Sequence, residues 1–386
     1  MSRIKLTQTC EIRTGKLDAN AAENNGKYPY FTCAPEPLKI NTYAFDDDVI
    51  LLAGNNASGN FHCQRYKGKF NAYQRTYVIT AKEGYDIEYI YYNLLINLYQ
   101  LKRIAQGSQT KFLTMQILDA FEIEDIEYSE QKRLVKSLTS IDNKIKNNKK
   151  INNELIQIAK DTFNYWFLQY DFPNEENKPY KTSGGEMKWC EELKRNIPKD
   201  WEIGNLYDIA DFVNGLACQK YRPINSKDKM PVVKITEMHD GITEATEWVR
   251  TDIPEKNIID DGDILFSWSA TLETMIWSGG KCGLNQHIFK VSPKNYSKFY
   301  VYMQLSAYIV NFVMMAEARK TTMGHITTDH LRQSKIVLPK IEIAEKFNEK
   351  VSPLLLEIIR NDVENRKLSA LRDFILPMLM NGQLTC

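Results

Sequence analysis

Two stretches of this sequence carry the same apolar series, in which spacings of three and four residues alternate. The first series consists of Leu134, Leu138, Ile141, Ile145, Asn148, Asn152, Leu155, Ala159, Thr162 and Trp166. The second begins 213 residues later and consists of Phe347, Val351, Leu354, Ile358, Asn361, Asn365, Leu368, Arg372, Ile375 and Leu379. This spacing is typical of a long helix in a coiled coil. Because neither helix can bury its apolar face alone, the two are expected to pack against each other.

The similarity between the two halves extends upstream of the helices. Matching positions, with a few residues of slippage, are Leu113-Thr114 with Ile326-Thr327, Leu118 with Leu331, Asp48–Leu51 with Asp263–Phe266, and Gln74 with Gln286. A period this long excludes a solenoid, whose units run to about 20–50 residues. The chain is therefore predicted to be duplicated, in the order domain, long helix, domain, long helix.

The globular part of each half is predicted to be mixed. Short β-rich runs bounded by Gly and Asn turns predict strands at Val49–Leu52, Thr76–Thr80, Val232–Ile235, Asp263–Trp268 and His287–Val291. An apolar helix follows in each half, at Asp86–Ile104 and at Ser297–Ala316. The predicted fold class is α+β. The predicted parts are a first domain at 1–127, a long helix at 128–170, a linker at 171–198, a second domain at 199–340 and a second long helix at 341–384.

Antiparallel packing of the helices would place Asn148 opposite Asn365 and Asn152 opposite Asn361, in a polar layer that sets the register. The alternative is that these asparagines lie where the apolar face turns toward solvent. The predicted helix–helix core is Ile141, Ile145, Asn148, Asn152, Leu155, Leu354, Ile358, Asn361, Asn365 and Leu368. Ser352-Pro353 is a candidate start for the regular part of the second helix, and Pro377 should kink or end it. A rod of about 50 Å suits two DNA half-sites about one helical turn apart.

Composition limits the classes of partner. With 50 basic and 49 acidic residues the net charge is +1, so any nucleic-acid contact must come from local patches. Seven scattered cysteines without a C-x-x-C pair predict free thiols in a reducing cytosol. The start, Met1–Lys5, lacks the apolar stretch of a secretory signal, and the apolar run at 299–316 is too interrupted for a membrane span. A cytoplasmic protein without a membrane partner is predicted.

Motifs for catalysis, cofactors and metals are missing or weak. Gly54–Gly59 has the glycine spacing of a phosphate loop, but Asn60-Phe61 stands where Lys-Ser/Thr should follow. There is no Asn/Asp-Pro-Pro-Tyr run to accept a flipped adenine and no G-x-G-x-x-G. The acidic clusters Asp46–Asp48 and Asp260–Asp263 are better explained as turns before strands than as Mg²⁺ sites. His325 and His330 are five residues apart, which is not the spacing of a helical zinc pair. No catalytic residue, metal or cofactor is predicted in this chain.

The sequence resembles the specificity subunits of type I restriction-modification systems over essentially its whole length. The resemblance rests on the duplicated order of parts and on four segments: Trp166–Pro173, Lys178–Met187, Ile197-Pro-Lys-Asp-Trp201 and Leu368–Leu384. It departs at the start, where residues 1–9 leave little room for the Pro-x-x-Trp entry seen before the second domain, so a shorter opening strand is expected.

The resemblance implies that each globular domain is a target recognition domain for double-stranded DNA. The helices would be spacers that dock two modification (methyltransferase) subunits, and restriction (motor and nuclease) subunits would join the full complex. S-adenosylmethionine, ATP and Mg²⁺ would be bound by those partners. The chain itself would be a non-catalytic subunit of the DNA adenine methyltransferase and ATP-dependent endonuclease.

Polar and basic loop residues are the candidates for DNA contact, because their donors and acceptors match base edges and phosphates. One group is predicted in the turn before the central strand of each domain: Arg65, Lys67, Lys69, Asn71, Gln74 and Arg75, with Lys281, Asn285, Gln286 and His287. The other is predicted in the loop after the apolar helix: Ser108, Gln109, Thr110 and Lys111, with Arg319, Lys320, Thr321, Thr322 and His325. The alternative for each residue is a solvated loop position. Near-neutral charge predicts weak, salt-sensitive DNA binding by the chain alone.

Two other functions remain possible from the sequence. One is a self-contained nuclease or methyltransferase, which the missing motifs disfavour. The other is a coiled-coil adaptor that binds only proteins and recognises no DNA sequence.

Overall fold

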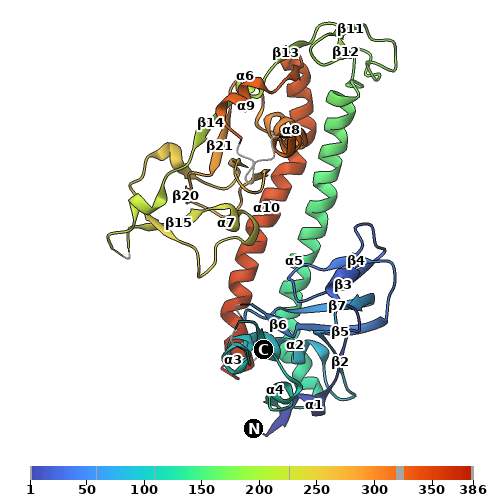
Figure 1. Ribbon diagram of the computed structural model, residues 1–386, viewed down its shortest axis with the longest axis vertical. Coiled ribbons are helices and arrows are strands. Elements are labelled where there is room, and N and C mark those ends of the chain that lie inside the picture. The colour runs from blue at the N-terminus through green and yellow to red at the C-terminus, as the bar shows by residue number, and fades with distance from the viewer. Residues whose placement is uncertain (1, 58, 108, 226, 319–325, 384–386) are drawn as a thin grey trace. The chain divides into compact units, whose positions relative to one another are not determined.

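The computed structural model describes residues 2–57, 59–107, 109–225, 227–318 and 326–383 (Figure 1). The chain forms two compact units. The first unit is Met1–Lys144 with Leu368–Cys386, and the second is Ile145–Lys367. Each of the two long helices therefore contributes one part to each unit.

A six-stranded sheet forms the body of the first unit, in the order β2-β8-β5-β7-β3-β4. Its strands are β2 (Cys10–Thr14), β3 (Tyr28–Phe31), β4 (Leu38–Ile40), β5 (Phe45–Ala53), β7 (Cys63–Ala72) and β8 (Thr76–Ala81). Neighbouring strands are antiparallel except for β3 and β7. In β5, Ile50 and Leu52 pack in one apolar cluster while Val49 and Leu51 pack in another. Both faces of β5 are thus buried, which explains its continuous apolar run.

Two helices supply much of the larger cluster in this unit. They are α2 (Ile87–Ile96) and α3 (Leu98–Ile104), so the single helix predicted at 86–104 is interrupted at Asn97. Asp86 caps α2 by accepting hydrogen bonds from the backbone N–H groups of Glu88 (3.0 Å) and Tyr89 (3.2 Å). Smaller elements are β1 (Arg3–Lys5), α1 (Leu6–Thr9), η1 (Ala19–Ala21), β6 (Asn55–Asn56), β9 (Lys111–Phe112), α4 (Met115–Asp119) and β10 (Glu122–Glu124).

The second unit has two four-stranded sheets, in the orders β14-β21-β18-β19 and β16-β15-β20-β17. Their strands are β14 (Ala210–Asn214), β15 (Lys229–Val233), β16 (Trp248–Arg250), β17 (Ile258–Ile259), β18 (Ile264–Ser267), β19 (Glu273–Ile276), β20 (Cys282–Leu284) and β21 (Ile288–Pro293). The predicted strands therefore lie in β15, β18 and β21 here, and in β5 and β8 of the first unit. Ile235 is an exception, because it begins helix α7 (Ile235–Asp240).

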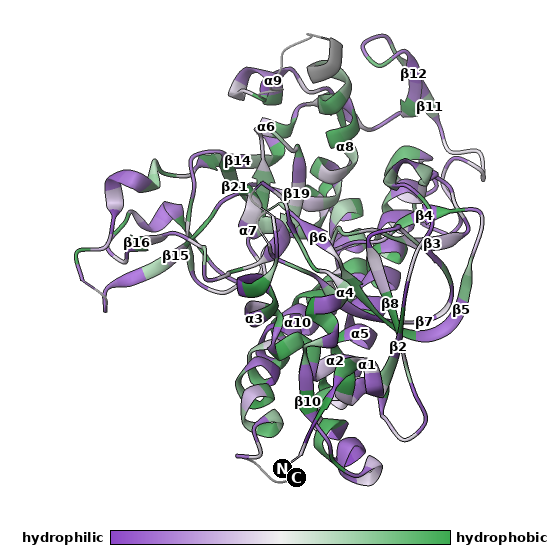
Figure 2. Ribbon diagram, turned by 60° about the horizontal axis from the view of Figure 1, so that its bottom comes forward, coloured by the Kyte–Doolittle hydropathy of each residue, from purple (hydrophilic) through white to green (hydrophobic). Residues whose placement is uncertain are grey.

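Helix α8 (Lys298–Ala318) packs against β19 and β21, and hydrophobic residues dominate it (Figure 2). Tyr300, Leu305 and Phe312 on this helix are fully buried. The remaining elements of the unit are β11 (Met187–Cys190), β12 (Arg195–Pro198), β13 (Glu202–Gly204), α6 (Leu206–Ile209), η3 (Cys218–Tyr221), η4 (Glu255–Asn257), α9 (Thr328–Gln333) and β22 (Ile336–Leu338). No helix in the described ranges has the length and apolar character needed to cross a membrane.

The segment predicted as a linker is packed. Phe172, Cys190 and Ile197 are buried in the large apolar cluster of the second unit, and β11 pairs with β12 as an antiparallel hairpin. The turn-forming residues at 171–198 therefore belong to a packed segment with a β-hairpin, and this segment is not a flexible linker.

The long helices are α5 (Tyr128–Phe163), followed by a π-helical turn at Asn164–Leu168, and α10 (Ile341–Met380). The expected helix start at Pro353 is wrong, because α10 runs through that residue. Proline costs the helix one backbone hydrogen bond, but the fully buried Val351 and Leu355 hold both sides of the exposed Pro353 in the core. The helix ends three residues after Pro377, so this proline does lie in its last turn.

The four predicted asparagines meet in a buried polar layer of the second unit. The Asn148 amide donates to Asn365 Oδ1 (2.9 Å), and the Asn361 amide donates to Asn152 Oδ1 (2.9 Å). This order shows that the two helical segments run antiparallel within the unit. None of the four side chains belongs to a residue more than 8% exposed, so the solvent-facing alternative is wrong.

The predicted apolar partners of this layer are less deeply buried than the asparagines. Ile145 is buried, and the others are half-buried, namely Ile141, Leu155, Leu354, Ile358 and Leu368. In the first unit the same helices are joined by Arg372, whose guanidinium donates to Asp142 Oδ1 at 2.9 Å.

Asp362 gives the polar layer a pH dependence. Its Oδ1 accepts a hydrogen bond from the Asn152 amide (2.7 Å). Burial raises the pKa of Asp362, and the Asn152 amide and Lys149 oppose that rise. A carboxyl group with a raised folded-state pKa destabilises the fold when ionised, and this cost is relieved as the pH falls through that pKa. Asp362→Asn removes this contribution, so the melting temperature of the variant should fall relative to that of the wild type as the pH is lowered from 7 toward the ordinary pKa of a carboxyl group.

Asp161→Asn, an exposed position on α5, is the matched control and should keep the wild-type pH dependence. Identical pH profiles for the wild type and Asp362→Asn, measured by circular dichroism, would contradict the prediction.

Candidate nucleic-acid interface

Three loops of the first unit are joined by backbone hydrogen bonds at Gly54. The Gly54 N–H donates to the Arg75 carbonyl (2.8 Å), and the Leu113 N–H donates to the Gly54 carbonyl (2.8 Å). Strand pairing also places Asn56 opposite Lys111. We call residues 54–57, 59–60, 73–75, 106–107 and 109–112 the first loop cluster. It brings together the predicted segments Gln74-Arg75 and Gln109–Lys111.

The loop after α3 is held in a narrow conformation. Gln106 and Phe112 exchange two backbone hydrogen bonds, of 3.0 and 2.8 Å, which close the loop between them. Gly107 has φ +97°, and a Cβ atom there would lie 2.1 Å from the Thr110 carbonyl oxygen. Only glycine fits this position. The closed loop leaves Gln109 and Thr110 exposed.

Four predicted residues lie on strand β7 instead of in a turn: Arg65, Lys67, Lys69 and Asn71. The turn prediction is wrong because Gly68, with φ +126°, lies inside a ten-residue strand that pairs with β5. Lys67 and Lys69 are exposed, and the Lys69 ammonium lies 4.7 Å from the ring centre of Tyr43. Asn71 is 5% exposed and its Oδ1 accepts from the Ala72 N–H.

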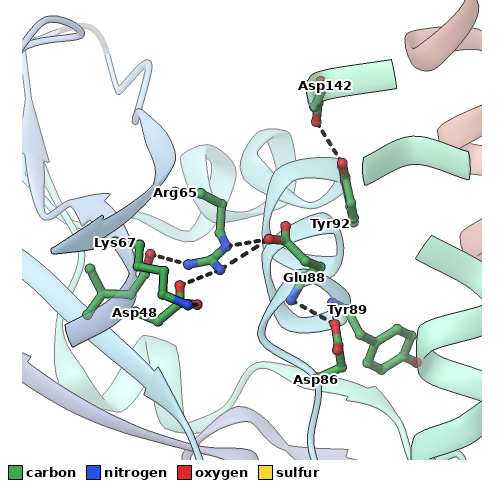
Figure 3. A network of polar contacts seen from close by, with 9 residues as sticks. Asp48, Arg65, Lys67, Asp86, Glu88, Tyr89, Tyr92 and Asp142 are labelled. Carbon is green, nitrogen blue, oxygen red and sulfur yellow. Dashed lines mark hydrogen bonds and ion pairs between the residues drawn. The ribbon is translucent and has the colours of Figure 1, made fainter. Parts of the chain in front are cut away.

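Arg65 is held by two carboxylates (Figure 3). Its guanidinium lies 2.6 Å from Asp48 Oδ1 and 3.1 Å from Glu88 Oε1, and its side chain is 17% exposed. Burial raises the pKa of Glu88, and the Arg65 charge opposes that rise. A base contact by Arg65 would require breaking both ion pairs, so Arg65 is not included in the interface proposed below.

The two acidic clusters have different local structures. Asp46–Asp48 lies within β5, which begins at Phe45, so the expected turn there is wrong. Its carboxylates bind cations of β2 and β7, with Arg13 2.9 Å from Asp47 and Arg65 2.6 Å from Asp48. Asp260–Asp263 does form the expected turn before β18, with the Asp263 N–H donating to the Asp260 carbonyl (3.0 Å). No group of three or more His, Cys, Asp or Glu residues arranged to hold a metal occurs in the described parts of the chain.

The second unit repeats the bonding pattern of the first loop cluster. The Trp268 N–H donates to the His287 carbonyl (3.3 Å), and the Ile326 N–H donates to the Trp268 carbonyl (3.0 Å). Trp268 thus occupies the place of Gly54, and His287 the place of Arg75.

A second pair of bonds supports the same correspondence. The Gln74 N–H donates to the Leu17 carbonyl (2.9 Å), and the Gln286 N–H donates to the Leu216 carbonyl (2.8 Å). Gln74 and Gln286 therefore occupy equivalent positions, as the sequence alignment of the halves predicts.

The side chains of Gln286 and His287 in the second unit are half-buried, whereas those of Gln74 and Arg75 in the first unit are exposed. Asn285 is 8% exposed, and its Oδ1 accepts from the His287 N–H (3.3 Å). The His287 ring lies 5.5 Å from that of Trp268. Lys281 is exposed just before β20. The predicted residues Ser108, Arg319, Lys320, Thr321, Thr322 and His325 lie outside the described residues.

Sequence reasoning missed two residues of this surface. The Lys102 ammonium, from α3, donates to Asn60 Oδ1 at 2.6 Å. The sequence places Lys102 in an apolar helix, and the glycine spacing of Gly54–Gly59 points only to a phosphate loop for ATP. The sequence does not show that these two segments lie side by side.

Burial keeps several cysteines protonated. It raises the pKa of Cys10, Cys63 and Cys282 to about 12 and that of Cys218 to about 11. The thiolate is the reactive form of cysteine, so these thiols are not poised as nucleophiles at neutral pH.

Comparison with known proteins finds a match in each half of the sequence. The family model for the type I restriction modification DNA specificity domain matches residues 1–157 and again residues 198–370. The EcoDI specificity subunit of Escherichia coli is 25% identical over 403 residues, covering 99% of this chain and 88% of that protein. The MjaIX specificity subunit of Methanocaldococcus jannaschii is 26% identical, covering 79% and 71%.

The fold is also similar to that in the crystal structure of a type I restriction-modification S subunit from M. genitalium. The TM-score is 0.58 at 14% identity, and the match covers 98% of this chain and 95% of that one. The chain therefore belongs to the family of type I restriction-modification DNA specificity subunits.

Proposed function

We propose that each unit reads one half of a bipartite DNA site through its loop cluster. The observation that carries this proposal is the equivalent placement of Gln74-Arg75 and Gln286-His287, held by the same backbone bonds in both units. Their side chains carry donors and acceptors that match base edges. Because arginine in one unit is replaced by histidine in the other, the two half-sites should differ in sequence.

The helices are proposed to set the spacing of the half-sites and to dock two methyltransferase subunits. With 36 residues, α5 is about 54 Å long. One turn of DNA is about 34–36 Å, so the helix is longer than one turn of the duplex. Exposed aliphatic side chains on both helices, such as Ile151, Ile158 and Leu356, suit contact with protein partners.

The chain is proposed to act without catalysis of its own. S-adenosylmethionine, ATP and Mg²⁺ would be bound by modification and restriction subunits. With a net charge of +1, the isolated chain should bind DNA weakly, and the partner subunits should supply further phosphate contacts.

Replacing Gln109, Thr110 and Lys111 by alanine should change the DNA sequence that the assembled complex methylates. The change should be confined to one half of the motif, because these residues belong to one loop cluster. Methylome sequencing of a host that expresses the variant measures the motif, and size-exclusion chromatography measures assembly, which should be unaffected.

The control is Glu175→Ala with Glu176→Ala, an exposed pair in the turn before the β11–β12 hairpin, which should leave the motif unchanged. An unaltered motif in the assembled alanine variant would contradict the assignment of the loop. Absence of any sequence preference in the wild-type complex would favour the adaptor function, and methylation by the isolated chain with S-adenosylmethionine would favour a self-contained enzyme.

A further inference from the structure

Two lysines of the first unit converge on one glycine. Lys102 comes from α3 and Lys111 from β9, and a Cβ atom on Gly59 would lie 3.2 Å from the Cγ atom of each. Gly59 is buried beneath these stems and has φ +75°. The loop is fixed below it, because the Gly59 N–H donates to the Asn56 carbonyl (3.2 Å) and the buried Phe61 follows.

Among the residues that the structure describes, no carboxylate is paired with these two charges. Within the described ranges, neither lysine forms an ion pair with a carboxylate, whereas Lys67 on β7 lies 3.6 Å from Asp48. The polar partner of Lys102 is the neutral Asn60. An ammonium group has three donors, so Lys102 keeps two after this bond. Two ammonium groups on stems that meet at one glycine raise the local positive potential, and an anion bound there lowers it.

We infer that Lys102 and Lys111 bind a backbone phosphate of the DNA and so position the neighbouring loop on the duplex. The inference rests on the proposed function. A phosphate is favoured over a base because lysine presents a compact point charge, and phosphate contacts set the orientation of a protein on DNA. Gln109 and Thr110, exposed in the adjoining closed loop, are left for base contact.

The arrangement also explains why residue 59 is a glycine. Any side chain at position 59 would have to adopt a left-handed backbone conformation and would push against both lysine stems. Gly59 thereby lets the two lysine stems approach the same point. Asn60 orients Lys102 from the side without neutralising it.

The test uses the chain assembled with its methyltransferase subunits and a fluorescent duplex carrying the motif found by methylome sequencing. Lys102→Gln and Lys111→Gln should each weaken binding roughly tenfold, as expected for one charge-assisted contact. The weakening should be equal for the motif and for an unrelated duplex. The slope of log Kd against log salt should fall by about 0.9 for each lysine removed.

Arg103→Gln is the matched control, because Arg103 is exposed on the same helix and its guanidinium is not part of the pair. It should leave affinity and salt slope near the wild-type values, and all variants should keep the wild-type melting temperature. Wild-type affinity and slope in the Lys102→Gln/Lys111→Gln double variant would overturn the inference while leaving the proposed function intact. A wild-type complex without sequence preference would instead overturn the proposed function.

To distinguish binding of a free anion from binding of DNA, the measurements are repeated in inorganic phosphate and in chloride at the same ionic strength. DNA affinity of the wild type should be the same in both salts. A rise in melting temperature that is specific to phosphate and absent in the double variant, with DNA affinity unchanged, would assign the site to a free anion and overturn the assignment to DNA.

Discussion

Replacing Trp201 by alanine should lower the free energy of unfolding by about 4 kcal/mol, in the range measured for large aromatic residues removed from cores. Trp201 is 2% exposed. Its ring stacks on Phe172 with a centroid distance of 4.8 Å and contacts Tyr170 at 5.7 Å and Phe167 at 5.9 Å. Alanine would remove the transfer free energy of the indole and leave a cavity among rings from the π-helical turn and from the segment that follows it. Urea denaturation followed by circular dichroism measures the loss.

Trp189→Ala is the matched control, since Trp189 on β11 is 58% exposed. Surface substitutions of this kind usually change stability by less than about 0.5 kcal/mol. Equal losses for the two tryptophans would contradict the assignment of Trp201 to the core. A large loss at Trp201 alone is the result expected if its ring packs on Phe172, which lies between the two family-matched regions.

That segment shows where sequence reasoning falls short. Residues 171–198 are rich in turn formers and charges, which predicted a linker, yet Phe172, Cys190 and Ile197 are buried. The apolar residues are too far apart in sequence to form a periodic pattern. They become a cluster only because the β11–β12 hairpin folds the chain back on itself.

The helix pairing could be predicted because its signal is local and repeated. Alternating spacings of three and four define one helical face, and asparagines at corresponding places on both helices define the register. The observed Asn148–Asn365 and Asn152–Asn361 bonds confirm both predicted pairs. Burial at Val351 and Leu355, by contrast, is a tertiary effect that overrides the helix-breaking tendency of Pro353.

The candidate interface was predicted in part. Gln74, Arg75 and the loop at 109–111 do meet at Gly54. Arg65 could not be excluded from sequence, because its partners Asp48 and Glu88 come from a neighbouring strand and from α2. Lys102 could not be included for the same reason, since its contact with Asn60 joins residues 42 positions apart.

Replacing Asn152 by leucine should lower the free energy of unfolding by about 3 kcal/mol, because buried polar groups would lose their partners. Asn152 Oδ1 accepts from the Asn361 amide (2.9 Å), and its own amide donates to Asp362 Oδ1 (2.7 Å). Leucine would leave the Asn361 donor and the Asp362 carboxylate unpaired within the layer. Asn153→Leu, at the exposed next position, should have little effect in the same urea titration.

The double variant Asn152→Leu/Asn361→Leu separates lost hydrogen bonding from altered shape. Removing both amides leaves no buried amide without a partner, so part of the lost stability should return, as when both members of a buried polar pair are replaced by apolar groups. A loss in the double variant equal to the sum of the single losses would mean that the amide pair is not the cause. Recovery would show instead that these asparagines specify which positions of the two helices meet, at some cost in stability, since two leucines can pack in more than one register.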